Sequence, residues 1–409
     1  MRKLYKNIGQ LVQTREGKNK LRGEEMNLLP YINNAFLIIN NGKIENFGSM
    51  SQLIDEKSFD EIIDVKGKVI MPTWTDSHTH LVFAASRVNE FVDKINGLSY
   101  EEIAAKGGGI LNSAKKMEEI EEGELLKNAK ILLNEAIKYG TGAIEIKSGY
   151  GLSKNAELKM LRVIKQLKEY SPIPIKATFL GAHAVPAKFK QNKKAYIEIL
   201  INEILPVIAE EKLADYIDVF CEKNYFTSDE TDKILQEGAK YGLKPKIHAN
   251  QFTSIGCIEK AIKNKAVSVD HLEVMKNTDF SALENSNTIA TLLPGCSFFI
   301  DIPYAPARKM IEKDIAISLA TDFNPGSTPT FNMNFIISLA CIKQKLTPEQ
   351  AINAATVNAA AALELSEETG SIAKGKKANI MIMKPYIKSY KEIPYYFGTN
   401  PVEQTIVSQ

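Results

Sequence analysis

Histidine is the residue through which this chain could perform metal chemistry, because it is scarce and falls in a pattern. Only five histidines occur in 409 residues, and two of them, His78 and His80, stand two positions apart in the segment TDSHTHLVFAASR. On a β-strand, side chains two residues apart point to the same face. Two imidazoles on one face can share a cation, so this pair predicts part of a metal site.

The other three histidines and one carboxylate each end a short apolar run. His183 ends IKATFLGAH, His248 ends KPKIH, His271 ends AVSVDH and Asp322 ends AISLATD. If these runs are parallel strands of a barrel, their carboxyl ends meet at one rim, where barrel active sites form. Singly, each histidine has a plainer interpretation as a core residue, and Asp322 as the start of an Asx turn. Their joint placement favours a metal site.

A ligand set of three histidines and one carboxylate leaves a coordination position open for water, as in catalytic zinc sites. Ligands of this kind suit Zn(II) or iron, and the sequence does not choose between them. Such an ion lowers the pKa of its water towards about 7 and polarises a carbonyl, so the predicted chemistry is metal-assisted hydrolysis. The predicted ligands are His78, His80, His248 and Asp322.

The elements that must position these residues alternate between helix and strand. Apolar side chains in residues 124–140 follow one helical stripe that Gly140 ends, and GAIEIKSGYG then predicts a strand running into a loop. The unit recurs, and with VIMPTWTDSHTH as the first, eight short apolar strands alternate with helices. This pattern is typical of an α/β protein with a (β/α)8 TIM-type barrel. A doubly wound open sheet is the competing topology, but it usually has fewer strands.

Sequence rich in β-strand signals flanks the barrel. Residues 35–49 contain two apolar runs around Asn41-Gly42, a hairpin signature. After a helix start with a capping box at Thr347, the segment GSIAKGKKANIMIMKPY again predicts strands. The economical arrangement is a small β-sandwich-like domain built from residues 1–70 and 370–409, with the hydrolase barrel in residues 71–369.

Composition excludes several classes of protein. The 51 basic and 49 acidic residues are mixed along the chain, so no sustained field favours a nucleic acid partner. No apolar run approaches the roughly 20 residues that span a bilayer, and the N-terminus lacks the pattern of a signal peptide. We therefore predict a cytoplasmic protein without a membrane role, and the sequence is compatible with a homodimer. Widely scattered cysteines predict reduced, buried thiols: Cys221, Cys257, Cys296 and Cys341.

The motifs together resemble the metal-dependent amidohydrolase superfamily over nearly the whole chain. They comprise a PxxxDxHxH opening strand, single histidines ending later strands, a late aspartate and GSIAKGKKANIMIM. Within it, HTHLVFAASRVNEF, AAKGGGI, EIKSGYGL, TFLGAHAVP, DVFCEKNYF, KIHANQF, VDHLE and TDFNPGS are similar, in this order, to the imidazolonepropionase family. The resemblance implies a small-molecule substrate, 4-imidazolone-5-propanoate, hydrolysed to N-formimidoyl-L-glutamate with one Zn(2+) or Fe ion per chain.

The resemblance also implies roles for residues at the rim. Arg87 would bind the carboxylate tail of the substrate, which suits a planar guanidinium, although a surface salt bridge is the plainer interpretation. Asp322 would take a proton from the attacking water, and His271 and His183 would stabilise the oxyanion or orient the carbonyl. The implied substrate positions are Tyr150, His183, Gln251, Asn324, Gly326 and Ser327.

Two positions depart from the family pattern. Gln251 stands where some relatives have glutamate; it can bind the ring or the water, but it cannot act as a base, which shifts that task to Asp322 or His271. Before the histidine pair, Pro-Thr-Trp-Thr replaces a glycine-containing turn. Lys147 is a candidate by position for a carbamylated lysine bridging two metals, but its neighbours match mononuclear relatives, so one ion is expected.

Two other functions stay open. An aromatic deaminase of guanine or an adenosine derivative would share the metal ligands. Arg87, Tyr150, the turn at 324–327 and the lack of an acidic residue at position 251 argue against it. A non-catalytic scaffold on the same fold is the other alternative, but no expected ligand is missing from the sequence.

Overall fold

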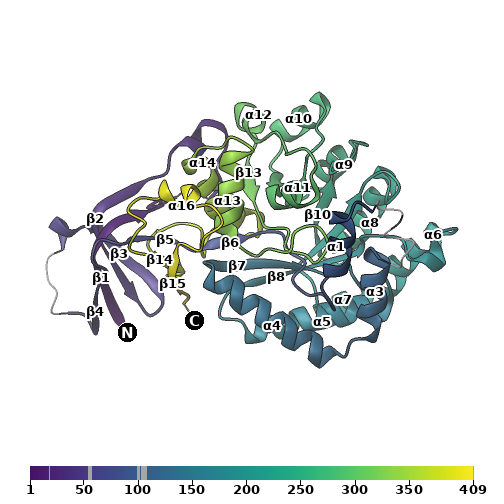
Figure 1. The fold of residues 1–409 in the computed structure, drawn as a ribbon, viewed down its shortest axis with the longest axis horizontal. Coiled ribbons are helices and arrows are strands. Elements are labelled where there is room, and N and C mark those ends of the chain that lie inside the picture. Colours follow the sequence, from purple (N-terminus) through teal and green to yellow (C-terminus); the bar gives the residue numbers. More distant parts are fainter. Residues whose placement is uncertain (18, 54–57, 99–101, 103–107, 409) are drawn as a thin grey trace.

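The computed structural model describes residues 1–17, 19–53, 58–98, 102 and 108–408. Most of the glycine-rich segment at 104–110 therefore lies outside the described residues. Figure 1 shows a small sheet of purple and yellow strands beside a larger barrel, which carries the middle of the chain.

Eight parallel strands form the barrel, and they follow one another in chain order. They are β6 (Trp74–Asp76), β7 (Thr141–Lys147), β8 (Ile175–Ala182), β9 (Tyr216–Cys221), β10 (Lys244–Ala249), β11 (Ser268–His271), β12 (Ile289–Leu292) and β13 (Ile317–Leu319). Beyond β6 and β13 the chain nearly closes the barrel, because His80 N donates to Phe323 O at 2.8 Å and Asp322 N to His78 O at 3.0 Å. The predicted barrel is confirmed.

Helices connect the strands and cover the outside of the barrel (Figure 1). They are α1 (Val88–Ile95), α3 (Ile110–Glu119), α4 (Glu122–Lys138), α5 (Lys154–Tyr170), α6 (Lys193–Ile199), α7 (Leu205–Glu211), α8 (Ser228–Lys240), α9 (Cys257–Lys263), α10 (Asn277–Glu284), α11 (Pro294–Ile300), α12 (Ala307–Glu312), α13 (Met333–Ile342), α14 (Pro348–Asn353) and α15 (Ala359–Ala362). Single turns of other helix types are η1 (Gly23–Asn27), η2 (Met50–Gln52), η3 (Ala187–Phe189), η4 (Leu200–Ile204) and η5 (Ala354–Asn358).

Helix α4 shows why these elements form where the sequence predicts them. It buries Leu125, Ala129 and Leu133 on one stripe, as the helical period requires. Gly140 follows it with φ +99°, and a Cβ there would lie 2.8 Å from Met381 Sδ. Glycine is therefore needed both for the backbone conformation and for the close packing.

The small sheet takes strands from both ends of the chain. Its order is β15-β14-β5-β1-β2-β3, with β4 also paired to β1. The predicted hairpin is confirmed, since β2 and β3 are antiparallel and Asn41 and Gly42 both have positive φ, as a type I′ turn requires. The bounds are β1 (Arg2–Val12), β2 (Tyr31–Asn40), β3 (Lys43–Ser49), β4 (Glu61–Asp64), β5 (Val69–Pro72), β14 (Ile380–Met383) and β15 (Val402–Ile406), with α16 (Glu392–Tyr395) between the last two.

The first predicted barrel strand is in fact shared between the two sheets. Strand β5 pairs with β1 and β14, and only the chain from Trp74 onward pairs with the barrel. Thr73 N donates to Asn379 O in the small sheet, whereas the next amide, Trp74 N, donates to Gly140 O in the barrel. One apolar run therefore serves both sheets, which hydrophobicity alone could not reveal.

Residues after the barrel tie the N-terminal segment to it. The predicted capping box is confirmed, because Thr347 Oγ1 accepts from Gln350 N and the Gln350 side chain accepts from Thr347 N. The following helix carries buried asparagines, of which Asn358 donates both to Leu21 O at 3.0 Å and to Ile317 O at 2.7 Å. These bonds hold the connection between the small sheet and the barrel.

The cysteines differ from the prediction. Cys221, at the end of β9, and Cys257, at the start of α9, form a disulfide, so the prediction of four reduced thiols is wrong for this pair. They are 36 residues apart in the chain and meet only through the fold. Cys296 and Cys341 are free. No helix in the described ranges is both long and apolar enough to cross a bilayer.

Candidate active site

The side chains at the carboxyl ends of the barrel strands meet at one point. Asp322 Oδ1 lies 3.5 Å from Nε2 of His78 and 3.5 Å from Nε2 of His80. His248 Nε2 lies 3.4 Å from His80 Nε2. All four side chains are buried. His78, His80 and Asp322 have ligand atoms within 4.8 Å of one another, and His248 forms a second such group with His78 and His271.

This centre fits a metal ion on chemical grounds. His78 Nε2 is fully buried and has no hydrogen-bond partner among the described residues. Buried polar atoms are rarely left this way unless an ion or water satisfies them. Burial, together with nearby positive groups, lowers the pKa of His78 and His80 well below the ordinary value, so both are neutral, the form that binds a metal. Such a donor set suits zinc or iron.

Two carboxylates contact the Nδ1 atoms of two of these imidazoles, on the side away from the centre. His78 Nδ1 lies 2.6 Å from Asp270 Oδ2, and His248 Nδ1 lies 3.0 Å from Asp218 Oδ2. The hydrogen bond at His78 Nδ1 fixes the tautomer that leaves Nε2 free for an ion, whereas the contact of His248 Nδ1 is an ion-pair distance without hydrogen-bond geometry among the described residues. Sequence reasoning missed both aspartates, although the signal was present as one acidic residue inside each of two apolar strands, DVFC and SVDH.

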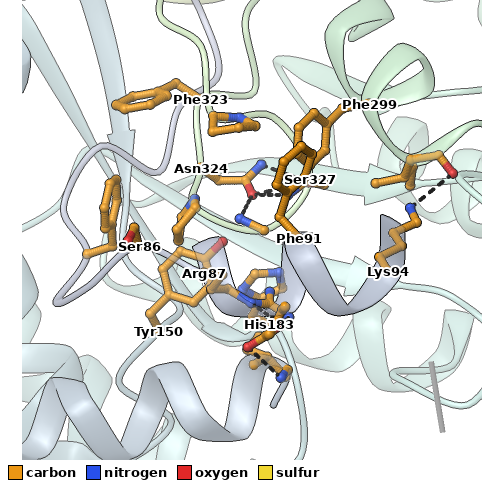
Figure 2. A pocket seen from close by; sticks show the side chains of 18 of the residues that line it. Ser86, Arg87, Phe91, Lys94, Tyr150, His183, Phe299, Phe323, Asn324 and Ser327 are labelled. Atoms are coloured by element: carbon orange, nitrogen blue, oxygen red, sulfur yellow. Dashed lines mark hydrogen bonds and ion pairs between the residues drawn. The ribbon is translucent and has the colours of Figure 1, made fainter. Parts of the chain in front are cut away.

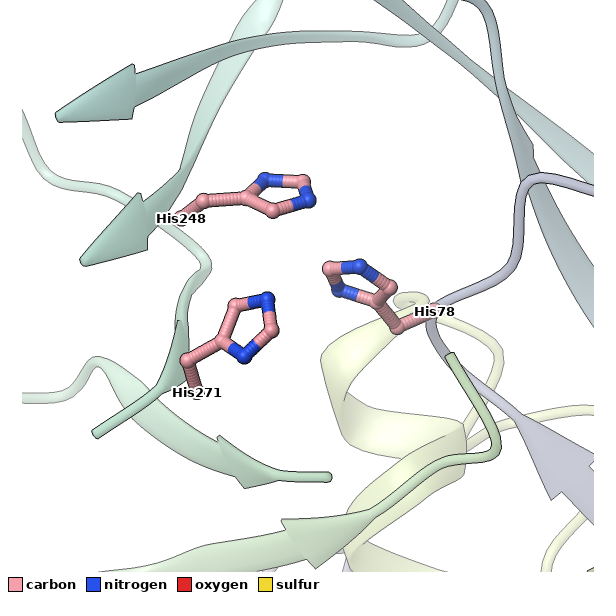
Figure 3. A group of neighbouring side chains, drawn as sticks. All are labelled: His78, His248 and His271. Carbon is pink, nitrogen blue, oxygen red and sulfur yellow. The ribbon is translucent and has the colours of Figure 1, made fainter. Parts of the chain in front are cut away.

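His271 lies on the other side of this group, and Figure 3 shows its ring facing those of His78 and His248. Its nitrogen lies within 4.8 Å of theirs, so distance alone would permit it as a ligand. However, its Nδ1 is 3.3 Å from Glu273 Oε1. Burial opposes a charge on His271, but Glu273 and the Cys296 thiol raise its pKa well above the ordinary value. The charged form suits a proton donor and does not bind a metal.

Left-handed backbone conformations occur at the same strand ends, as they do elsewhere in the chain. His271 has φ +87° and Asp322 has φ +54°, both in the left-handed region that side chains other than glycine rarely adopt. Asn250, two residues after His248, has φ +57°. Such conformations persist only where the surroundings determine them, and they are common in active sites.

A cavity of about 630 Å³ opens next to the histidine cluster. Figure 2 shows the rings of Phe91, Phe299 and Phe323 in its wall, with polar side chains such as Asn324 and Ser327 among them. Its size and mixed lining suit one small organic molecule with a polar group. All the predicted substrate residues line it: Arg87, Tyr150, His183, Gln251, Asn324, Gly326 and Ser327.

Arg87 is held in this wall by an ion pair. Its Nε and Nη2 lie 2.7 Å and 2.5 Å from Glu90 Oε2, one turn along α1, and Glu90 Oε1 accepts from Gly109 N at 3.0 Å. A Cβ on Gly326 would lie 2.3 Å from Arg87 Nη1, so glycine is needed there. The salt bridge is therefore real, but it takes only the Nε–Nη2 edge of the guanidinium, and within the described residues no hydrogen bond to Nη1 is found.

The turn after Asp322 is organised by Asn324. Its Oδ1 accepts from Gly326 N at 2.8 Å and from Ser327 N at 2.7 Å, and its Nδ2 donates to Asp322 O at 2.6 Å. The Asx turn therefore begins at Asn324, so the alternative interpretation of Asp322 is wrong. Because the polar atoms of Asn324 bond within the loop, its role is to fix the loop that lines the cavity.

The remaining rim residues have defined hydrogen-bonding states. His183 Nδ1 lies 3.1 Å from Gly149 O, and since a carbonyl only accepts, this nitrogen carries the hydrogen. Burial, aided by His248, lowers the pKa of His183 to about 3, so its Nε2 is an acceptor at neutral pH. Gln251 Nε2 donates to Cys296 Sγ at 3.3 Å. Sequence reasoning assigned no role to Cys296, because a lone cysteine carries no pattern.

Comparison with known proteins identifies relatives at two levels. The model of the amidohydrolase family matches residues 69–408. Imidazolonepropionases of Flavobacterium johnsoniae, Flavobacterium psychrophilum and Christiangramia forsetii are 57%, 55% and 53% identical to this chain. The alignments cover 99%, 100% and 99% of this chain and 98%, 99% and 98% of those enzymes.

Solved structures with the same fold are more distant in sequence. A triazine hydrolase variant superposes with a TM-score of 0.76 at 13% identity, covering 100% of this chain and 93% of the other. Guanine deaminase of E. coli gives 0.74 at 14% identity, covering 100% and 98%. At this identity the likeness shows the shared fold alone.

Proposed function

This chain belongs to the amidohydrolase family, with the imidazolonepropionases as relatives over its whole length, and from that membership we propose its reaction. It is a hydrolase that cleaves the ring C–N amide bond of 4-imidazolone-5-propanoate to give N-formimidoyl-L-glutamate, a step of histidine degradation. The observation that carries the proposal is the identity of 53% or more over nearly the full chain to enzymes of that name.

The cavity supports a substrate with a ring at one end and a carboxylate at the other. The Nη1–Nη2 edge of Arg87 offers two parallel N–H donors to a carboxylate. Tyr150 lies between Arg87 and the histidines, with its ring centroid 5.7 Å from that of His80. Burial raises the pKa of its phenol, so the hydroxyl remains a donor at neutral pH. His183 Nε2 can accept from a ring N–H.

We place one zinc or iron ion on the predicted ligands. When bound, it supplies an activated water and polarises the ring carbonyl. Two observations support a single ion: contacts of 3.4 or 3.5 Å link the four predicted ligands, and Lys147, the candidate for carbamylation, is fully buried and paired with Glu145 and Asp218 at 2.8 Å each. The ligands are His78, His80, His248 and Asp322.

The protein groups around this centre divide the proton transfers between them. Asp322 contributes a buried carboxylate at this centre, and it can accept a proton from the attacking water. His271, charged through Glu273, can hydrogen-bond the developing oxyanion or give a proton to the leaving ring nitrogen. Gln251 cannot take a proton, and its position supports an orienting contact with the ring.

The test is a parallel assay of ring opening and deamination. Purified, metal-loaded protein should hydrolyse 4-imidazolone-5-propanoate and release no ammonia from guanine or adenosine derivatives. Ammonia release without ring opening would instead support the purine-type deaminase. A cytoplasmic location and a homodimer stay proposals; light scattering on the purified protein measures the second.

A further inference from the structure

Deeper in the barrel than the predicted ligands lies a group of five charged side chains with no access to solvent. Three are carboxylates and two are lysines, contributed by β7, β9, β10 and β11: Glu145, Asp218, Asp270, Lys147 and Lys246. Charges taken out of water are costly unless they are paired. A barrel core can be filled by apolar side chains instead, so this group needs an explanation.

Lys147 is the member that joins the group to the site. Its Nζ lies 2.8 Å from Asp218 Oδ2 and 3.6 Å from Asp270 Oδ2. These are the same two oxygens that contact His248 Nδ1 at 3.0 Å and His78 Nδ1 at 2.6 Å. One ammonium group therefore lies behind two imidazoles at once.

We propose that Lys147 is a positioning residue for the metal site, which holds the carboxylates of Asp218 and Asp270 and through them the rings of His78 and His248. The inference rests on the proposed metal centre. The Lys147 ammonium donates hydrogen bonds to Asp218 Oδ2 and to Glu145 Oε1, both at 2.8 Å, and Asp270 Oδ2 is a third ion-pair partner at 3.6 Å. No lone pair is left to form a carbamate, so the role is electrostatic.

The charge balance gives the reason for a lysine here. Lys147 holds one oxygen of each aspartate against the Nδ1 atom of a histidine, which leaves the Nε2 atoms of His78 and His248 directed towards the centre. The two lysines neutralise two of the three carboxylates. The remaining negative charge, together with Asp322, matches the charge of a divalent cation.

Lys246 provides a matched control. It is also fully buried, and it binds the same glutamate, with Nζ 2.5 Å from Glu145 Oε2 and 3.0 Å from Ser77 O. Its ion pair with Glu145 is the only one found for it within the described part of the chain. Lys147→Met and Lys246→Met therefore remove equal buried charges, but only the first removes a contact behind the histidines.

The experiment measures zinc affinity of the metal-stripped full-length chain by competition with a chromophoric chelator. We expect Lys147→Met to weaken binding by about 10- to 100-fold, the usual effect of losing a group behind a ligand, and Lys246→Met by less than about 3-fold. The visible absorption of the cobalt(II)-loaded protein should change in the first variant alone. Equal zinc affinities in the two variants would overturn the proposal.

A second pair of variants covers the case in which an unpaired buried charge prevents folding. Each lysine change is combined with Glu145→Gln, so that both double variants lose one positive and one negative charge. The same difference in zinc affinity and in the cobalt spectrum is expected, and its absence would refute the role of Lys147. If the unmodified chain bound no zinc, the proposed metal centre would be refuted. That outcome is distinct from a failure of the proposal for Lys147.

Discussion

We call the histidines and Asp322 at the strand ends the base of the active site, and it lies inside the barrel. The rim, which carries Arg87, lies in loops and on the short helix α1. At the base, the histidines stand at strand ends, and His78 and His248 each have a carboxylate behind them. At the rim, Arg87 precedes α1, a helix that buries none of its residues. The ion-pair partner of Arg87 is Glu90 in this helix. The base is held from several sides, whereas the α1 part of the rim buries no side chain.

This difference assigns separate tasks to the two regions. The base carries the proposed metal ligands and proton acceptors. The rim offers a guanidinium, a phenol and aromatic walls, which choose one molecule among many. Changes at the base should therefore abolish chemistry or metal binding, and changes at the rim should alter substrate affinity.

The largest expected effect comes from removing the metal ion from the base. Chelation should reduce hydrolysis to background, and zinc or iron should restore it, because no protein group replaces the ion as an activator of water. An ion that binds only the folded chain also stabilises it, by about 4 kcal/mol at a thousand times its dissociation constant. Activity and melting temperature before and after reloading measure both effects. Full activity in protein proven free of metal would contradict the assignment.

Asp322→Asn should have the next largest effect. The amide has nearly the same shape but cannot accept a proton, so kcat should fall by about 10²- to 10⁴-fold. The assay needs excess metal ion and a measured metal content, because Oδ1 is also a predicted ligand. An active, metal-loaded variant would transfer the role of base to His271.

Much of the base could be predicted from the sequence, because its residues stand at strand ends, where a parallel barrel must bring them together. The residues that lie behind them could not be predicted from the sequence. Asp218 and Asp270 occupy ordinary positions within apolar strands, and only the packing of neighbouring strands shows that they face histidines. For the same reason the sequence named Lys147 as a candidate for carbamylation by position alone, and did not show the three carboxylates around it.

The residues of the rim were predicted from the family resemblance more than from the pattern of the sequence. Nothing in the spacing of Arg87 distinguishes it from a surface arginine, and its contact with Glu90 depends on the start of α1. The division of the first predicted strand between two sheets, and the pairing of Cys221 with Cys257, also follow from tertiary contacts between distant segments. Local sequence does not encode such contacts.

Arg87→Ala tests the rim directly and should have an intermediate effect. Losing two charge-assisted hydrogen bonds to the substrate's carboxylate should raise KM by about 10- to 100-fold, with little change in metal content. Glu90→Gln is the control, because it keeps the guanidinium and weakens only its support, so KM should rise less. Parallel loss of metal and of substrate affinity in Arg87→Ala would mean that Arg87 supports the fold.

The last prediction compares the same isoleucine-to-alanine change in the rim helix α1 and in the base. The change in α1 is expected to have the smallest effect. Ile95 at the end of α1 is 67% exposed, so Ile95→Ala should alter the free energy of unfolding by less than about 0.5 kcal/mol. Ile247, beside His248 in β10, is 0% exposed, and Ile247→Ala should cost about 2–5 kcal/mol through the cavity it leaves. Urea unfolding of the metal-free protein measures both. Similar losses would show that the rim is packed as firmly as the base, and the division of tasks would then need another cause.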